Sequence, residues 1–333
     1  MKCWIITEGI AGTENQCIGV AEALGVTPEI KRVSLRQPWR VLSPYLGLES
    51  GRIFNPPLLP PWPDILITSG RKSIAAARYI KKASAGKTFT VQIQDPRISP
   101  KNFDLVAVPE HDPTRGENVI ITAASPNRVT DKKLAEAKEQ FRAQFEHIKP
   151  PRVAVLIGGN SKSHRLTTEI IRRLAAQLKN LDAGLMITAS RRTGEENISL
   201  LKEHLSKHPL PDANAPSLSL QGEGSRERDF FFWNGSGDNP YFGMLAWADY
   251  ILVTADSASM LSDAATTGKP VYMIKLEGGS PRLDKLHENL KRRGIIRDFE
   301  GVLEHWTYEP LRDSINLATE IRKRMTGHIA EQV

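Results

Sequence analysis

Cysteine is almost missing from the 333-residue chain, which contains only Cys3 and Cys17. Neither lies in a paired-thiol or metal-ligand spacing, so a disulfide framework and a zinc site are not expected. Long apolar runs are missing too, since no segment approaches the ~18 uninterrupted apolar residues of a membrane-spanning helix. The N-terminal MKCWIITEGIAG is too short in apolar residues for a signal peptide and predicts a buried strand. The expected location is cytoplasmic, with peripheral attachment at the inner membrane face left open.

The chain also lacks the G-x-G-x-x-G spacing, with an acidic residue downstream, that marks dinucleotide-binding domains. This absence disfavours NAD binding and epimerase chemistry, and no cofactor is expected. Lys and Arg number 45 against 38 Asp and Glu, and the net charge of +7 suits anionic partners such as nucleotides or phospholipid headgroups. Because no RNA-binding or helix-turn-helix motif accompanies this charge, nucleic acid is not an expected partner.

Short apolar runs alternate with helical patterns along the chain, which is typical of βαβ units and a parallel sheet. In the first half the pattern predicts strands over 2–7, 64–68, 88–94 and 103–108. It restarts after Pro150-Pro151, with strands predicted over 152–157, 184–188, 229–233, 250–254 and 271–274. The predicted fold class is therefore α/β, with two doubly wound Rossmann-like domains facing a cleft.

The proline pair predicts the boundary between these domains, because it cannot continue the helix that precedes it. Residues 1–149 are expected to form an acceptor-side domain and residues 150–309 a nucleotide-binding domain. Residues 310–333 are predicted to contain a C-terminal helix that packs back across the hinge. The stretch 208–228 is rich in Pro, Ser, Gly and Asn without periodicity, and predicts a mobile insertion.

Four loops of the second half follow predicted strands or precede helices, over 158–163, 188–193, 234–239 and 254–260. Ligands of doubly wound sheets bind at such loops, where backbone amides and helix N-termini converge. Paired glycines let the backbone approach an anion, and arginines can pair with a diphosphate. The predicted nucleotide-binding residues are Gly158, Gly159, Asn160, Ser161, Ser163, Ser190, Arg191, Arg192, Asp256, Ser257, Ser259, Met260 and Asp263.

Each of these features also has a purely structural interpretation. A glycine pair suits a tight turn before a helix capped by Ser or Thr, and an arginine after a strand is commonly a solvated charge. Since side chains diverge in a turn, only one of Arg191 and Arg192 is expected to reach a ligand. Asp263 can accept hydrogen bonds from ribose hydroxyls, or merely complement the positive end of its helix.

The run from Thr254 to Pro270 resembles the nucleotide-binding segment of glycosyltransferases with the GT-B architecture, in which small residues, an acidic residue and Gly-x-Pro follow a serine-rich turn. Those enzymes have Glu at the ribose position, where this chain has Asp263, so the contact needs a closer approach. From end to end, apart from 208–228, the chain resembles the mitochondrial-fission "elongated mitochondria" family, whose many bacterial members are often labelled nucleoside-diphosphate-sugar epimerases. The matching motifs are Gly9-x-x-Gly12-x-Glu14-Asn15-Gln16, Gly158-Gly159-Asn160, Ser190-Arg191-Arg192-Thr193, Thr254-x-Asp256-Ser257-x-Ser259-Met260 and the tail from Phe299 to Trp306.

This resemblance implies a GT-B-like fold and a sugar-nucleotide site. The function expected from it is a glycosyltransferase that needs no metal and moves a sugar from a nucleoside-diphosphate sugar to an unknown acceptor, lipid-linked acceptors included. The alternative is a non-catalytic adaptor of the fission-family type that acts at a membrane surface. The basic stretch 282–293 is one candidate for contact with an anionic membrane, although most such helix faces are merely solvated.

The first half offers loops for the acceptor and a general base for its hydroxyl. The base is sought at predicted strand ends, where Glu8, Asp95 and His111 lie. His111 has Glu110 and Asp112 as neighbours that would raise its basicity, although a lone histidine in a polar loop is more often a surface residue. The predicted acceptor-side residues are Gly9, Gly12, Glu14, Asn15, Gln16, Ser69 and Arg71.

Overall fold

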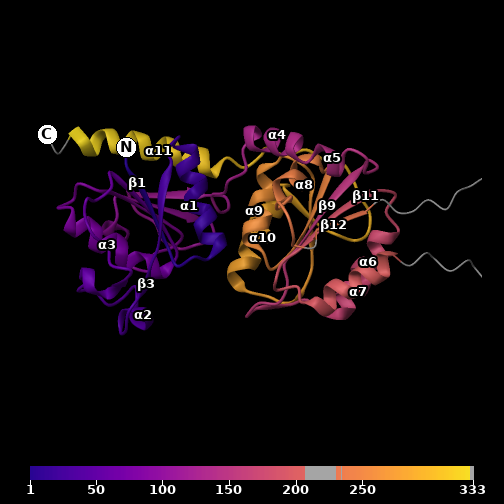
Figure 1. The fold of residues 1–333 in the computed structure, drawn as a ribbon, viewed down its shortest axis with the longest axis horizontal. Coiled ribbons are helices and arrows are strands. Elements are labelled where there is room, and N and C mark those ends of the chain that lie inside the picture. Colours follow the sequence, from indigo (N-terminus) through magenta and orange to yellow (C-terminus); the bar gives the residue numbers. More distant parts are fainter. Residues whose placement is uncertain (207–229, 234, 331–333) are drawn as a thin grey trace, which may run out of the picture. The chain divides into compact units, whose positions relative to one another are not determined.

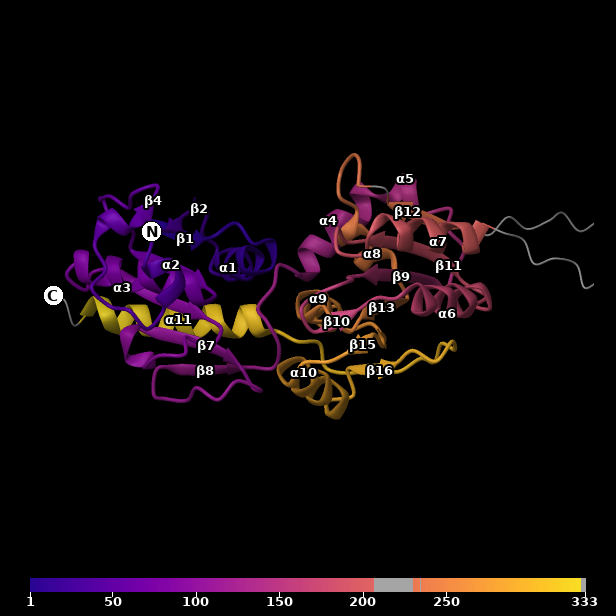
Figure 2. The same cartoon turned by 90° about the horizontal axis from the view of Figure 1, so that it is seen from below.

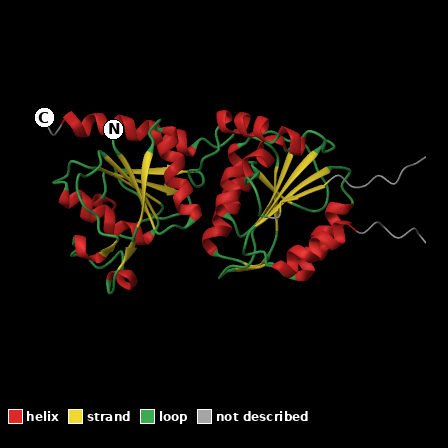
Figure 3. Ribbon diagram, viewed as in Figure 1, coloured by secondary structure: helices red, strands yellow, loops and turns green. Residues whose placement is uncertain are grey.

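The computed structural model describes residues 1–206, 230–233 and 235–330. Contacts divide the chain into two compact units, Met1–Val129 with Leu311–Val333, and Thr130–Pro310. Each unit is built on a six-stranded parallel sheet with helices packed against it (Figures 1, 2 and 3). The α/β class with two doubly wound sheets is therefore confirmed. The insertion predicted over 208–228 lies outside the described residues.

The first unit has its strands in the order β2-β1-β5-β6-β7-β8, and all neighbours are parallel. One face of its sheet packs against α1 and α11 and the other against α3, and both interfaces are apolar cores. Its elements are β1 (Cys3–Thr7), α1 (Ala11–Ala23), β2 (Pro28–Arg32), β3 (Ser34–Leu35), α2 (Trp39–Leu42), β4 (Phe54–Asn55), β5 (Ile65–Ser69), α3 (Ile74–Ala83), β6 (Phe89–Ile93), β7 (Leu105–Pro109), β8 (Val119–Thr122) and α11 (Asp313–Ala330).

The second unit has the strand order β12-β11-β9-β13-β14-β16, again all parallel. Helices α6 and α7 cover one face of its sheet, where they close an apolar core with β9 and β11. Its elements are α4 (Asp131–Gln140), α5 (Arg142–Phe145), β9 (Arg152–Ile157), β10 (His164–Arg165), α6 (Thr168–Lys179), β11 (Gly184–Ala189), α7 (Glu195–Ser206), β12 (Phe230–Trp233), α8 (Tyr241–Trp247), β13 (Tyr250–Thr254), α9 (Ala258–Thr266), β14 (Val271–Ile274), β15 (Glu277–Gly278), α10 (Pro281–Arg292) and β16 (Ile296–Asp298).

Each sheet reverses its strand order beside the first strand of its unit. In the first unit β1 lies between β2 and β5, and in the second unit β9 lies between β11 and β13. Chains leave such a pair of strands in opposite directions, which opens a crevice at their carboxyl ends where ligands of doubly wound sheets bind. Two places therefore merit attention, the carboxyl ends of β1 and β5 and those of β9 and β13.

Three local features differ from the sequence prediction. Helix α1 begins at Ala11, so Gly12, Glu14 and Asn15 lie inside a helix and not in the predicted loop. Helix α4 packs against α8 and belongs to the second unit, so the chain crosses between units after Val129 and not at Pro150. Strands β2, β8 and β16 were not predicted; all three lie at sheet edges, where a strand buries little apolar surface.

The C-terminal helix α11 completes the first unit. Leu317, Ala318 and Ile321 are fully buried in the core that α11 shares with α1 and the sheet. At its start, the Asp313 carboxylate accepts the backbone N–H groups of Ala123 and Ala124 at 3.0 and 2.9 Å. Among the helices that the structure describes, none is long and apolar enough to span a bilayer.

Candidate functional site

Loops after β9 and β13 are tied together at the switch point of the second sheet. The Gly158 N–H donates to Thr254 Oγ1 at 2.7 Å, and the Gly159 N–H donates to Asp256 Oδ2 at 3.1 Å. A Cβ on Gly158 would lie 2.3 Å from Asp256 Oδ1, a distance that no side chain tolerates. The glycine at 158 is therefore required for the carboxylate of Asp256 to lie directly against the β9 loop.

The loop after β11 joins the same cluster. The Asn160 N–H donates to the Arg192 carbonyl at 3.0 Å, and the Ser190 hydroxyl donates to the Gly158 carbonyl at 2.7 Å. Gly159 has a φ of 151°, and a Cβ there would lie 2.2 Å from the Arg192 carbonyl oxygen. The backbone N–H groups of residues 158–160 all donate to acceptors within the protein. The glycine pair therefore serves close packing, and none of these N–H groups is left to donate to a ligand.

Arg192 and Asp256 form an ion pair at the centre of this cluster. Arg192 Nη2 lies 2.8 Å from Asp256 Oδ2; the Asp256 side chain is fully buried, whereas 45% of the Arg192 side chain is exposed. Asp256 Oδ1 is buried and has no hydrogen-bond partner among the described residues. The buried carboxylate thus holds one nitrogen of the guanidinium, while nearly half of the Arg192 side chain stays open to solvent. Neighbouring Arg191 is exposed and has no ion-pair partner in the described part of the chain.

The N-terminus of α9 lies beside this ion pair in the chain, directly after Asp256. Ser257 caps the helix, since its Oγ accepts the Met260 N–H at 3.3 Å. The amides of Ala258 and Ser259 have no acceptor among the described residues. Free amides at the positive end of a helix dipole, next to a fixed guanidinium, form an arrangement that binds anions. The serine-rich loop over 254–260 therefore supplies the donors that the glycine pair does not.

Asp263 lies further along α9, where its carboxylate is already engaged. The Tyr241 hydroxyl of α8 donates to Asp263 Oδ2 at 2.8 Å. Burial raises the pKa of Asp263 to about 7, and the hydrogen bond from Tyr241 opposes that rise only in part. Burial likewise raises the pKa of the Tyr241 hydroxyl. A ribose hydroxyl at Asp263 would therefore have to share this carboxylate with Tyr241, a residue that the sequence did not single out.

The other polar residues after β9 stabilise the loop that leads to β10. Asn160 Oδ1 accepts the Leu166 N–H at 2.9 Å. Ser161 Oγ accepts the N–H groups of Ser163 and His164 at 3.3 and 3.0 Å. Ser163 Oγ in turn lies 3.0 Å from His164 Nδ1. These contacts explain the polar residues structurally, and their part in nucleotide binding stays a prediction.

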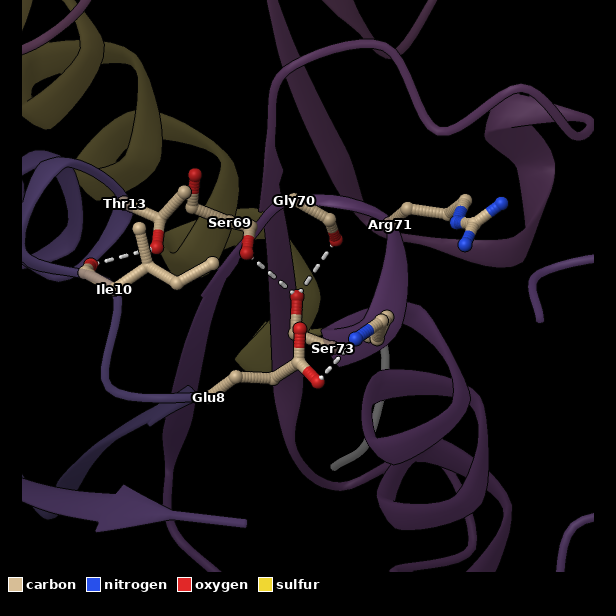
Figure 4. A pocket seen from close by; sticks show the side chains of 8 residues that line it. Glu8, Ile10, Thr13, Ser69, Gly70, Arg71 and Ser73 are labelled. Carbon is tan, nitrogen blue, oxygen red and sulfur yellow. Dashed lines mark hydrogen bonds and ion pairs between the residues drawn. The ribbon is translucent and has the colours of Figure 1, made fainter. Parts of the chain in front are cut away.

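At the switch point of the first sheet lies a pocket of about 220 Å³ (Figure 4). It is lined by the loop after β1, the start of α1, and the turn Arg71–Ser73 after β5. Glu8 reaches this pocket and accepts from Lys72 Nζ at 2.9 Å. The amides of Ala11, Gly12 and Thr13 at the start of α1 have no acceptor among the described residues. The pocket therefore combines a helix N-terminus with one carboxylate that is paired with Lys72, while the side chain of Arg71 extends away from Glu8 (Figure 4).

The structure brings only some of the predicted first-half residues to this pocket. Glu8, Ser69 and Arg71 line it, whereas Gly9 stays in the adjoining loop. The Ser69 hydroxyl donates to buried Gln16 at 2.8 Å, Glu14 pairs with Arg32 at 2.7 Å, and Asn15 is exposed on α1. Ile10, Thr13, Gly70, Lys72 and Ser73 complete the lining, and all five belong to the two first-half loops in which an acceptor was expected.

The two remaining candidate bases lie elsewhere in the first unit. Asp95 Oδ1 accepts the Arg97 N–H and the Thr114 hydroxyl, both at 2.8 Å. The His111 side chain is only 6% exposed, and its Nε2 lies 3.9 Å from Asp112 Oδ1. The His111 side chain is thus buried, although the polar loop that contains it suggested a surface histidine. Within the described ranges, no group of three or more His, Cys, Asp or Glu side chains is placed to hold a metal ion.

A solved structure shares the fold of the chain. Os79 from O. sativa, solved in complex with UDP, aligns with 98% of this chain and 94% of its own, at 10% identity and a TM-score of 0.50. At this identity the likeness concerns the fold alone. The predicted GT-B-like fold is confirmed.

Relatives also match in sequence. Mitochondrial fission protein ELM1 of Arabidopsis thaliana is 29% identical over 295 residues, which are 80% of this chain and 64% of the relative. The chain therefore spans less than two thirds of that relative's length. Uncharacterized protein RP120 of Rickettsia prowazekii (strain Madrid E) is 25% identical over an alignment that covers 97% of this chain and 98% of the relative. The sequence model described as Mitochondrial fission ELM1 matches residues 11–325, and the chain belongs to this family.

Proposed function

We propose that the chain is a glycosyltransferase that needs no metal ion and transfers a sugar from a nucleoside-diphosphate sugar to an acceptor hydroxyl. The observation that carries the proposal is the anion-binding arrangement at the second switch point. There, the half-exposed guanidinium of Arg192 is fixed by a buried carboxylate beside the uncapped amides of α9. A diphosphate is the anion that a doubly wound sheet binds at this place.

The donor's diphosphate would be held by two kinds of contact. The amides of Ala258 and Ser259 and the Ser259 hydroxyl would donate to its oxygens, and Arg192 would pair with it through the part of its side chain that stays open to solvent. As the bond between the sugar and the diphosphate breaks, its electron pair stays on the diphosphate. The same donors would stabilise this growing negative charge, which is what lowers the barrier in such a transfer. Asp263 is the proposed partner of the ribose.

The acceptor would bind at the pocket of the first unit. Glu8 is the preferred base, because its carboxylate lines this pocket, whereas Asp95 is held by two hydrogen bonds and the His111 side chain is buried. Glu8 would take the proton of the acceptor hydroxyl as its oxygen bonds to the sugar carbon. Lys72, whose Nζ is 2.9 Å from Glu8 Oε1, would hold the base in place between turnovers.

Calorimetry with UDP-, GDP-, ADP- and CMP-sugars tests the donor site. We expect one nucleotide class to bind below millimolar concentration, and Arg192→Gln to weaken that binding about tenfold, the effect of losing one charge-assisted contact. Arg191→Gln is the matched control, because it removes the same charge one residue away from the ion pair. No binding of any sugar nucleotide at millimolar concentration, or equal losses in both variants, would refute the proposed site.

A non-catalytic adaptor at a membrane surface remains the second candidate. It is favoured by the exposed apolar side chains of α2 and the loop after it, which a purely cytosolic enzyme does not need. Release of free nucleotide from the bound donor separates the two functions. The enzyme releases nucleotide at a rate that Glu8→Gln lowers by at least ~100-fold, in the range that general-base residues contribute. The adaptor binds without release, and Glu8→Gln changes nothing.

A further inference from the structure

One surface of the first unit exposes apolar side chains that the proposed reaction does not use. They lie on α2 and on the loop that follows it, at the lower edge of the unit in Figure 1. Val41, Leu42, Tyr45 and Leu48 are 63%, 48%, 68% and 88% exposed. Four large apolar side chains are thus exposed within eight residues, and apolar side chains that gather on a surface commonly mark a site for a partner or a membrane. We call residues 36–52 the apolar-basic segment.

This segment is fastened to the unit. Trp39 Nε1 donates to the Gly47 carbonyl at 3.1 Å, and the Ser43 hydroxyl donates to the Arg71 carbonyl at 3.3 Å. Arg78 of α3 donates to the Leu46 carbonyl at 2.9 Å and pairs with Glu49. Because the Ser43 hydroxyl and the Leu46 carbonyl, which lie between the exposed residues in the chain, are both bonded to the rest of the unit, the exposed apolar residues belong to an anchored segment.

The charge of the segment is the second observation. Arg36, Arg40 and Arg52 are exposed, and none has an ion-pair partner in the described part of the chain. The one acidic residue between 36 and 52 is Glu49, which Arg78 already neutralises. The apolar side chains are thus accompanied by three guanidinium groups and by no free carboxylate. This composition complements a surface that is apolar beneath and anionic at its border.

We propose that the apolar-basic segment docks the protein onto an anionic lipid bilayer. Val41, Leu42 and Leu48 enter the boundary between headgroups and acyl chains, where Tyr45 is also favoured because its ring is apolar and its hydroxyl polar. The arginines pair with lipid phosphates. A protein partner would need to bring its own acidic groups to the same pattern, whereas an anionic bilayer supplies both properties at once. The docking holds whether or not the chain transfers sugars.

Co-sedimentation of the full chain with vesicles tests the docking. We expect binding to vesicles that contain phosphatidylglycerol and roughly tenfold weaker binding to phosphatidylcholine alone, since each arginine near an anionic surface adds to affinity. Two variants should each lower binding at least tenfold, a triple Val41→Ser, Leu42→Ser, Leu48→Ser variant for the apolar contact and a triple Arg36→Gln, Arg40→Gln, Arg52→Gln variant for the charge. Thermal melting verifies that both remain folded, which their exposed positions favour.

Two controls make the result decisive. Val302→Ser with Ile315→Ser removes side chains that are 62% and 46% exposed elsewhere, and vesicle binding should not change. Arg282→Gln with Lys285→Gln removes basic charge from α10, the other candidate membrane face, and should leave most of the binding intact. Binding lost in the α10 variant but kept in the segment variants would overturn the proposal, as would no binding to either kind of vesicle. A change of oligomeric state in the apolar variant, without vesicle binding by the parent chain, would assign the segment to a second copy instead.

Discussion

Replacing Asp263 by Asn should stabilise the protein at neutral pH, because it removes a carboxylate that burial makes costly to ionise. In the folded chain the pKa of Asp263 is raised from 3.8 to about 7. Between these two values the folded state holds a proton that the unfolded state has already lost. Stability from this group is therefore complete below pH 3.8, falls as the pH rises towards 7, and is lost above it.

The size of the effect follows from the same two values. One pKa unit corresponds to ~1.4 kcal/mol, so a rise of about three units sets an upper limit of roughly 4 kcal/mol. Because Asp263 is only half-buried, water screens part of its charge, and we expect ~2–3 kcal/mol. Asparagine keeps an oxygen that can accept from the Tyr241 hydroxyl, so the variant should retain the hydrogen bond at 2.8 Å.

Urea unfolding at pH 5 and pH 8 measures this prediction. The parent chain should lose stability between the two, whereas Asp263→Asn should be nearly flat and more stable than the parent at pH 8. Tyr241→Phe provides a second test. Removing the hydrogen bond from Tyr241 should destabilise the ionised carboxylate of Asp263 further, so the free energy of unfolding should fall more steeply between pH 5 and pH 8. An Asp263→Asn variant that is less stable than the parent at pH 8 would mean that the ionised carboxylate makes a contact that the fold requires, and the reasoning would fail.

Four further substitutions probe other parts of the structure by urea unfolding. Gly158→Ala should cost ~2–3 kcal/mol, because its Cβ would lie 2.3 Å from Asp256 Oδ1, whereas helical Gly327→Ala meets nothing within 4 Å and should gain up to ~1 kcal/mol. Asp313→Ala should cost ~2–3 kcal/mol by freeing the amides of Ala123 and Ala124, and a loss under ~0.5 kcal/mol would contradict the anchoring of α11. Burial lowers the pKa of Lys269 to about 8, so the folded state binds fewer protons than the unfolded state above that pH. Its contribution to stability should rise from pH 8 to about 10.5, and Lys269→Met should abolish that rise.

Local sequence patterns predicted the interior of both sheets but not their margins. A central parallel strand is buried on both faces and is therefore largely apolar, as VAVL within β9 is, and such runs are visible in the sequence. Strand β2 reads Pro28–Arg32, PEIKR, and none of its residues is fully buried. Only its pairing with β1 makes it a strand, and pairing between segments is not written in local composition. The same reasoning applies to β16, a three-residue strand at the other margin of the second sheet.

The candidate sites show a similar limit. The serine-rich turn before α9 was predicted because a strand end, small residues and a helix start follow one another directly. The ion pair of Arg192 with Asp256 was not, because its members come from different loops and nothing local separates Arg192 from Arg191. The Lys72–Glu8 and Tyr241–Asp263 contacts likewise join residues 64 and 22 positions apart. Which polar residue is available to a ligand depends on what else it touches, and this required the structure.

The apolar-basic segment and the first-unit pocket share a physical connection that bears on the acceptor. Ser43, between the exposed Leu42 and Tyr45, donates to the backbone carbonyl of Arg71, and Arg71 is one of the residues that line the pocket. A segment docked on a bilayer would therefore hold the pocket within a few residues of the headgroup layer. An acceptor that enters the pocket from that layer carries its own lipid anchor and needs no route through water. If the chain is a transferase and docks in this way, the position of the pocket would favour a lipid-linked acceptor.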